Sequence, residues 1–219
     1  MVIMRKNIII AFALIFAFAS PSGAKSKTLA SFIDKVSSSL VSFEYSFTMQ
    51  TSRSSAKMTG AGDVRVQDNA FVLNGNGLEV WCDGSLRWTV DRLAEEALVE
   101  TVEESADVYA TNPALMITSV DSAFEEASFG TSKFQGKVVD ASVLTPLNKG
   151  KYSMDIAQLK LFFKSGTTEL VGAEVKLNDG SVSEFIIKDF TFSDRMETKE
   201  SFRFDEKTLD DSYVVTDLR

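Results

Sequence analysis

The sequence lacks histidine altogether and contains one cysteine, Cys82, and three prolines among 219 residues. Without histidine, Ser-His-Asp and Cys-His catalysis, HExxH zinc sites and every imidazole-ligated metal are excluded. A lone cysteine forms no internal disulfide, and no CxxC pair exists. Basic charge is scarce as well: 23 Lys and Arg against 31 Asp and Glu give a net charge of −8. This balance argues against a nucleic-acid partner. We expect no metal and no other cofactor.

Few of the remaining residues could support catalysis. Cys82 stands beside Asp83, whose charge tends to raise the pKa of the thiol, and no histidine is present to activate it. Acidic neighbours occur as Glu95-Glu96, Glu103-Glu104 and Glu125-Glu126. Adjacent residues on a strand point to opposite faces, so the members of each pair are poorly placed to act together. The sequence therefore predicts a structural cysteine and a protein that is not an enzyme.

The amino-terminal residues have the pattern of a secretory signal peptide. Arg5 and Lys6 precede an uninterrupted apolar run of 12 residues, 8–19, which is followed by Pro21 and the small residues 22–24. A membrane-spanning helix needs roughly 20 apolar residues, so the run is too short to cross a bilayer. We expect residues 1–24 to be a signal peptide cleaved after Ala24, with an uncleaved anchor as the alternative. Residues 25–219 then form one domain with 21 basic and 31 acidic side chains.

Two segments have helical spacing. From Lys27, apolar residues recur at positions 29, 32, 33, 36 and 40, which predicts an amphipathic helix with one buried stripe. Asn112-Pro113 places a good N-cap before a proline at the first helical position. We therefore predict a second, short helix from Pro113 to about Glu125.

The rest of the chain reads as strands. Phe43, Tyr45, Phe47 and Met49 alternate with polar residues, which is the period of a strand with one apolar face. Further strands are predicted at 57–66, 70–73, 78–82, 85–90, 97–102, 138–144, 156–164, 169–177 and 182–192. Asp83-Gly84 and the turn at 178–180 are tight hairpin signals. Short strands without intervening helices predict a mainly β domain with antiparallel pairing, in a sandwich or a barrel.

Phenylalanine is the residue in excess. Of 17 phenylalanines, 14 lie outside the predicted signal peptide, many at alternating positions of predicted strands. Such residues fill a core in most proteins. A large curled sheet with only two short helices has more concave surface than these helices fill, so part of this apolar surface could also hold a hydrophobic ligand.

The order of these elements resembles a known family. The motifs that carry the resemblance are, in chain order, Asp34-Lys35-Val36-Ser37-Ser38, Phe43-x-x-x-Phe47 with Gln50, Gly60-x-Gly62-x-Val64, Trp81-x-Asp83-Gly84-x-Leu86-x-Trp88 with Val90-Asp91, Asn112-Pro113, Leu144-Thr145-Pro146, Phe202-x-Phe204 and Val214-Val215-x-Asp217. Together they resemble the periplasmic outer-membrane lipoprotein carrier proteins, LolA-like, over essentially the whole of residues 25–219. The Asp-Gly-x-x-x-Trp element is the most diagnostic piece, and each piece alone is weak.

The resemblance implies a fold and a function. The expected fold is an unclosed antiparallel β-barrel, a half-barrel whose concave hydrophobic face is covered by short α-helices. The expected function is a periplasmic carrier for the acyl chains of lipoproteins, which an inner-membrane ABC transporter releases to it and which pass on to the outer membrane, with a possible acceptor there. We expect the carrier to act as a monomer. The lipid-binding groove is predicted at Phe43, Tyr45, Phe47, Met49, Phe71, Leu73, Trp88, Leu161 and Phe163. The helix is predicted to act as a lid through Leu115, Met116, Val120 and Phe124.

One departure from the family keeps alternatives open. The family commonly carries an arginine after the glycine-bearing strand that helps to hold the lid. Here the stretch reads Val66-Gln67-Asp68-Asn69, the nearest arginine is Arg65, and the role transfers to neither Asp68 nor Arg65. The first alternative is a periplasmic lipid-binding or sensor module of the same fold with another hydrophobic ligand or a regulatory partner. A hydrolase with an unrecognised acidic site and a structural β domain that binds a protein are the others.

Overall fold

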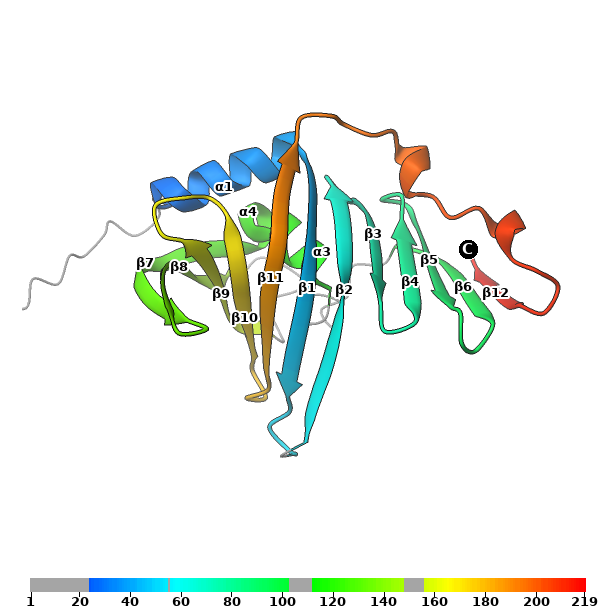
Figure 1. Ribbon diagram of the computed structural model, residues 1–219, viewed down its shortest axis with the longest axis horizontal. Helices are drawn as coiled ribbons and strands as arrows, with labels where there is room; N and C mark the ends of the chain where they lie inside the picture. The colour runs from blue at the N-terminus through cyan, green and yellow to red at the C-terminus, as the bar shows by residue number, and fades with distance from the viewer. Residues whose placement is uncertain (1–23, 55, 103–111, 148–155) are drawn as a thin grey trace, which may run out of the picture.

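The structure is a computed structural model that describes residues 24–54, 56–102, 112–147 and 156–219 (Figure 1). These residues form one large sheet and a few short helices. The helices are α1 Lys27–Ser38, α3 Pro113–Thr118 and α4 Val120–Ala123, with the 3-10 turns η1 Lys199–Phe202 and η2 Glu206–Thr208. The strands are β1 Leu40–Gln50, β2 Lys57–Gln67, β3 Ala70–Gly75, β4 Leu78–Cys82, β5 Leu86–Asp91, β6 Glu96–Thr101, β7 Phe124–Phe134, β8 Lys137–Pro146, β9 Ile156–Lys164, β10 Leu170–Leu177, β11 Val182–Ser193 and β12 Val214–Leu218.

The sheet is assembled from two meanders. Within the described residues it has 12 strands in the order β12-β6-β5-β4-β3-β2-β1-β11-β10-β9-β8-β7. Strands β1 to β6 are sequential neighbours, as are β7 to β11, and the two sets meet where β1 pairs with β11. Strands β7 and β12 are the two edges, so the sheet is not closed. The predicted mainly β, unclosed antiparallel fold with short helices is confirmed. One pairing differs, because β12 runs parallel to β6.

The described α-helices lie on one side of the sheet (Figure 1): α1 runs along the upper left toward the top of β11, and α4 and α3 lie behind β11 and β1. Helix α1 starts at the N-cap Ser26, whose hydroxyl oxygen accepts a hydrogen bond from the Leu29 amide at 3.2 Å. Leu29, Phe32 and Val36 are its buried residues, as the helical spacing predicts. Among the described residues, no helix is long and apolar enough to span a membrane. The predicted signal peptide lies outside the described residues, apart from Ala24.

The second predicted helix is shorter than expected. Asn112 caps α3 as predicted, accepting hydrogen bonds from the amides of Ala114 (2.9 Å) and Leu115 (3.4 Å). The helix is interrupted at Ser119, whose hydroxyl donates to the Leu115 carbonyl at 2.7 Å. Helix α4 ends at Ala123, and Phe124 opens β7 in an extended conformation. The prediction of one helix to Glu125 is therefore wrong, and Phe124 is a strand residue. A serine hydroxyl that donates to the carbonyl four residues earlier competes with the backbone hydrogen bonds of the helix.

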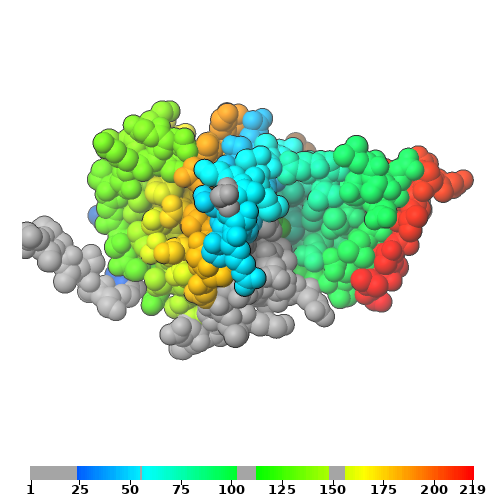
Figure 2. All heavy atoms as spheres, turned by 90° about the horizontal axis from the view of Figure 1, so that it is seen from below, coloured from blue at the N-terminus to red at the C-terminus, as the bar shows by residue number. Residues whose placement is uncertain are grey.

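The opposite, outer face of β3 to β6 is covered by residues 194–213, which we call the C-terminal segment. Phe202 and Phe204 are buried there, Phe202 against Val72 and Phe204 beside Trp88. Arg65 on β2 holds this segment: its guanidinium donates to both Glu197 carboxylate oxygens, at 3.0 and 2.9 Å, and to the Ser201 carbonyl at 2.9 Å. Figure 2 shows the red C-terminal residues along one end of the molecule, beyond the green strands.

Candidate functional site

The concave face of the sheet carries a continuous array of aromatic side chains. Phe32 of α1 packs against Phe163 of β9 with ring centroids 5.2 Å apart, and against Phe190 of β11 at 6.0 Å. Phe190 stacks on Phe43 at 5.5 Å. Further along β1 and β11, the rings of Tyr45, Phe47 and Phe185 lie within 5.8–6.4 Å of one another. The array thus runs from beneath α1 toward the β1–β2 hairpin.

Most of the predicted groove residues belong to this face. Phe43, Tyr45, Phe71, Leu73, Leu161 and Phe163 are buried in one hydrophobic cluster, and Phe47 packs against it. Met49 is half-buried on the same face of β1, near the hairpin. The predicted lid residues Met116, Val120 and Phe124 are buried in the same cluster, and Leu115 packs against it. The structure therefore brings the predicted groove and lid together, and their binding of lipid stays a prediction.

Trp88 is the exception, and its predicted place in the groove is corrected. The register pairs Phe71 with Cys82 and Cys82 with Arg87, so Arg87 shares the concave face. Trp88 is one residue further along β5 and points to the outer face, because side chains alternate along a strand. There it is buried beside Phe204, and its indole N–H donates to the Glu206 carboxylate at 2.9 Å.

The apolar part of the concave face ends near β5. Arg87 makes an ion pair of 2.8 Å with Glu100 of β6, and both side chains are partly exposed. The sequence analysis missed Phe185 and Ile187 of β11, which are buried in the cluster between the predicted residues of β1 and those of β9. The signal that could have found them is the spacing of Phe185 and Ile187, which lie two residues apart on a predicted strand. Phe190 joins the same face only because Asp189 takes a φ of 49° and shifts the phase of the strand.

Glycines let two of these rings lie against the sheet itself. A Cβ on Gly60 would stand 2.4 Å from Cε1 of Phe47, and a Cβ on Gly75 would stand 3.0 Å from the Tyr45 hydroxyl. Gly60 of the sequence motif on β2 therefore leaves room for the Phe47 ring, and Gly75 on β3 leaves room for Tyr45. Burial, and then the charge of Asp63, raise the pKa of the Tyr45 phenol, which stays protonated at neutral pH.

Polar contacts tie the helices to one another at one end of the layer. The Lys25 ammonium pairs with the Asp121 carboxylate of α4. The Ser26 amide donates to Glu126 of β7, and the Ser26 hydroxyl donates to the same carboxylate at 2.9 Å. These contacts fasten the beginning of α1 to the end of α4. Elsewhere the helices rest on the sheet through apolar side chains of the buried cluster.

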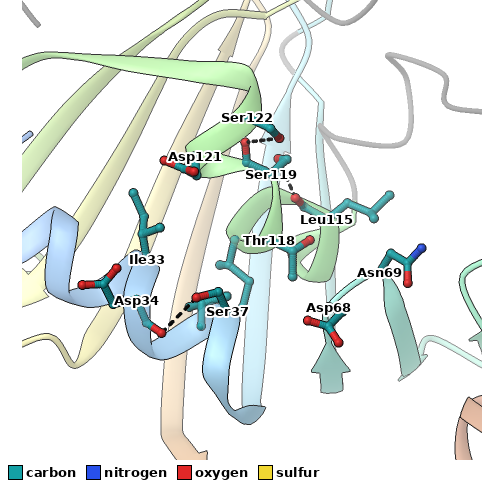
Figure 3. A pocket seen from close by; sticks show the side chains of 12 residues that line it. Ile33, Asp34, Ser37, Asp68, Asn69, Leu115, Thr118, Ser119, Asp121 and Ser122 are labelled. Carbon is teal, nitrogen blue, oxygen red and sulfur yellow. Dashed lines mark hydrogen bonds between the residues drawn. The ribbon is translucent and has the colours of Figure 1, made fainter.

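A cleft of about 500 Å³ opens between α1, α3–α4 and the β2–β3 turn (Figure 3). Its apolar lining consists of Ile33, Val36, Leu115 and Ile117. Its polar lining consists of Asp34, Ser37, Asp68, Asn69, Thr118, Ser119, Asp121 and Ser122. In Figure 3, Asp68 and Asn69 lie at the turn that follows β2, below and beside α3, and the Asn69 side chain points away from that helix. Among the described lining residues there is no basic side chain. The cleft marks a seam between α1 and the α3–α4 pair, where their side chains do not fill the space.

Arg65 does not reach this seam. Its contacts with Glu197 and Ser201, and its position 5.1 Å from the centre of the Phe202 ring, lie on the outer face. Asp68 stands at the seam with a φ of 53°. The arginine nearest to the family's lid-holding position thus serves the C-terminal segment.

Cys82 behaves as a structural cysteine. It is 1% exposed within the same cluster as the groove residues. Burial is the main cause that raises the pKa of its thiol, and Asp83 adds to it as the sequence predicts. In the described part of the chain, no group of three His, Cys, Asp or Glu side chains is arranged to hold a metal ion.

Comparison with known proteins finds similar structures at low identity. No protein-family model and no curated protein matches the sequence. A LolA superfamily protein from Nitrosomonas europaea is 10% identical, with a TM-score of 0.42, over 82% of this chain and 99% of that chain. A DUF1329 family protein from Desulfovibrio piger is 13% identical, with a TM-score of 0.46, over 83% and 96%. A putative outer membrane lipoprotein-sorting protein domain from Vibrio parahaemolyticus is 10% identical, with a TM-score of 0.40, over 77% and 92%. At TM-scores below 0.5, these similarities do not assign the chain to a family.

Proposed function

We propose that the chain is a periplasmic carrier that binds the acyl chains of lipoproteins on its concave face and moves them from the inner to the outer membrane. The observation that carries this proposal is the aromatic array of β1, β9 and β11 beneath a helical layer whose seam is open at the cleft. The motif order that resembles the lipoprotein carriers supports it. The predicted signal peptide supports a periplasmic location.

The physical chemistry of the face suits a reversible acyl binder. Burying one methylene group stabilises by about 0.8 kcal/mol, so one long acyl chain contributes on the order of 12 kcal/mol. Contacts of this kind are not directional, so a chain held only by them can be handed to another apolar surface. Met116 and Val120 occupy the surface that the acyl chain would take. Displacing them exchanges one apolar contact for another at a small net change in free energy.

The partners follow from the same proposal. An inner-membrane ABC transporter would release the acylated lipoprotein to the carrier, and an outer-membrane acceptor would receive it. The carrier would act as a monomer, because its apolar face is covered by its own helices between transfers. No bond is made or broken in such a cycle, so the proposed protein is a binding protein and not an enzyme.

A second candidate keeps the fold and changes the ligand. Arg65 is occupied by the C-terminal segment, and the seam is lined by the carboxylates of Asp34, Asp68 and Asp121. Among the described residues, no arginine lines this seam to hold the lid as in the resembling family, which favours a lipid-binding or sensor module with another hydrophobic ligand.

Native mass spectrometry of gently purified full-length protein separates these candidates. The carrier proposal expects an acylated polypeptide bound one to one. The second candidate expects a free lipid at the same stoichiometry. Protein that contains neither, and that does not bind an environment-sensitive lipid dye, would contradict both.

A further inference from the structure

Ser142 is a polar side chain without a partner inside the apolar face. It lies in the middle of β8, is 0% exposed, and its hydroxyl has no hydrogen-bond partner in the described structure. A buried hydroxyl that loses its water and gains no partner destabilises the fold, so such groups are uncommon in folded proteins. An alanine would fit the same position without this cost.

The register places Ser142 on the concave face. Its cross-strand neighbours are Phe129 on β7 and Leu161 on β9. Leu161 is fully buried in the cluster beneath the helices, and so is Leu144, two residues along β8 on the same side. Phe129 is 43% exposed and belongs to the edge strand. Ser142 therefore lies on the boundary between the buried apolar cluster and the open edge of the face.

This position matches one part of an acylated molecule. An acyl ester has a long apolar chain, then a carbonyl that accepts hydrogen bonds, then a polar remainder. A chain that lies over Leu144 and Leu161 would bring its carbonyl to the boundary, and the remainder would leave past Phe129. A serine hydroxyl is a donor that can satisfy such a carbonyl.

We propose that Ser142 is a ligand-binding residue whose hydroxyl donates a hydrogen bond to the carbonyl of a long-chain acyl ester held on the concave face. This inference rests on the proposed acyl-binding function and adds to it a polar contact and a direction for the chain. The hydroxyl is left unsatisfied in the free protein and becomes satisfied when the ester binds. Its presence then lowers the stability of the free protein and raises the affinity for the ligand.

The test compares two probes that differ by the ester group. Methyl laurate and tridecane are used to displace an environment-sensitive dye from the wild type, from Ser142→Ala and from Ser128→Ala. Ser128 is the matched control, because it is an exposed serine on β7 that pairs with Val143 on the outer face. Removing a neutral hydrogen bond should weaken methyl laurate binding by about fivefold in Ser142→Ala and leave tridecane binding unchanged. Ser128→Ala should bind both probes as the wild type does.

Thermal unfolding of the ligand-free proteins gives the second measurement. Ser142→Ala should unfold about 3 °C above the wild type, because it lacks the unsatisfied hydroxyl. If the wild type binds both probes and Ser142→Ala binds methyl laurate equally well, the role of Ser142 is refuted and the acyl-binding function stands. A lower unfolding temperature for Ser142→Ala would likewise overturn the inference. If the wild type binds neither probe, the proposed function fails, and the role of Ser142 fails with it.

Discussion

The cap of α3 should set how easily the helical layer opens. Asn112 is 7% exposed and accepts hydrogen bonds from two amides in the first turn of a helix that is only six residues long. A helix this short has little stability of its own and depends on its cap and its packing. Replacing an N-cap asparagine by alanine costs about 1–2 kcal/mol. The Asn112→Ala variant should lose stability by this amount.

The same loss shifts the opening of α3. Because about 1.4 kcal/mol corresponds to a tenfold change in an equilibrium constant, the open form of α3 should become about 5- to 30-fold more populated in Asn112→Ala. If α3 must leave the concave face before a lipid enters, uptake of an environment-sensitive lipid dye should accelerate by a similar factor. Stopped-flow fluorescence measures the uptake rate, and urea denaturation measures the stability.

Two controls define the outcome. Asn112→Ser keeps an oxygen that can cap the helix and should restore both the stability and the uptake rate. Ser26→Ala removes the corresponding cap of α1 and its contact with Glu126. Uptake that stays at the wild-type rate in Asn112→Ala, while stability falls as expected, would refute α3 as the gate. Acceleration in Ser26→Ala alone would assign the gate to α1.

Three further predictions concern other parts of the molecule. Phe47→Asp should abolish uptake of the lipid dye and leave the circular dichroism of the sheet unchanged. The control Ser46→Asp, on the outer face, should bind the dye normally. Equal dye binding by both variants would place the ligand elsewhere. Arg65→Ala removes the paired hydrogen bonds to Glu197, so hydrogen exchange should accelerate within residues 194–213 and stay unchanged in β1; protection that persists there would show that the buried phenylalanines suffice. The raised thiol pKa of Cys82 means that its contribution to folding stability is constant below the pKa of the unfolded thiol and declines as the pH rises above it. Urea titrations between neutral and alkaline pH should show this decline in the wild type and a smaller one in Cys82→Ala, and parallel curves would contradict it.

The alternation of apolar residues predicted most of the sheet, because strands with one buried face repeat every second residue. It placed Phe43, Tyr45 and Phe47 on one face correctly. It failed where a single residue changes the phase. The φ of 49° at Asp189 brings Phe190 to the concave face. The predicted second helix is interrupted at Ser119 and ends before Phe124, which is already extended.

Tertiary contacts explain the other failures. Trp88 shares the apolar side of β5 with Val90, but that side faces the C-terminal segment and not the concave face, and only the register with β4 decides this. The parallel pairing of β12 with β6 has no local signal, since it joins residues more than a hundred positions apart. The role of Arg65 likewise depends on where Glu197 arrives in the folded chain.

The join between β1 and β11 also dictates the order in which the chain can fold. Strand β1 can pair with β2 as soon as both are available. Its other edge stays unpaired until β11 is present, and all the strands from β2 to β10 lie between β1 and β11 in the sequence. Contacts over such separations form slowly, because the intervening chain must first be closed into a loop. The half from β1 to β6 can therefore assemble early with one edge unpaired and with Trp88 not yet covered by the C-terminal segment. Until β11 arrives, this half exposes an unpaired strand edge and uncovered aromatic surface, the features that make a folding intermediate prone to aggregate.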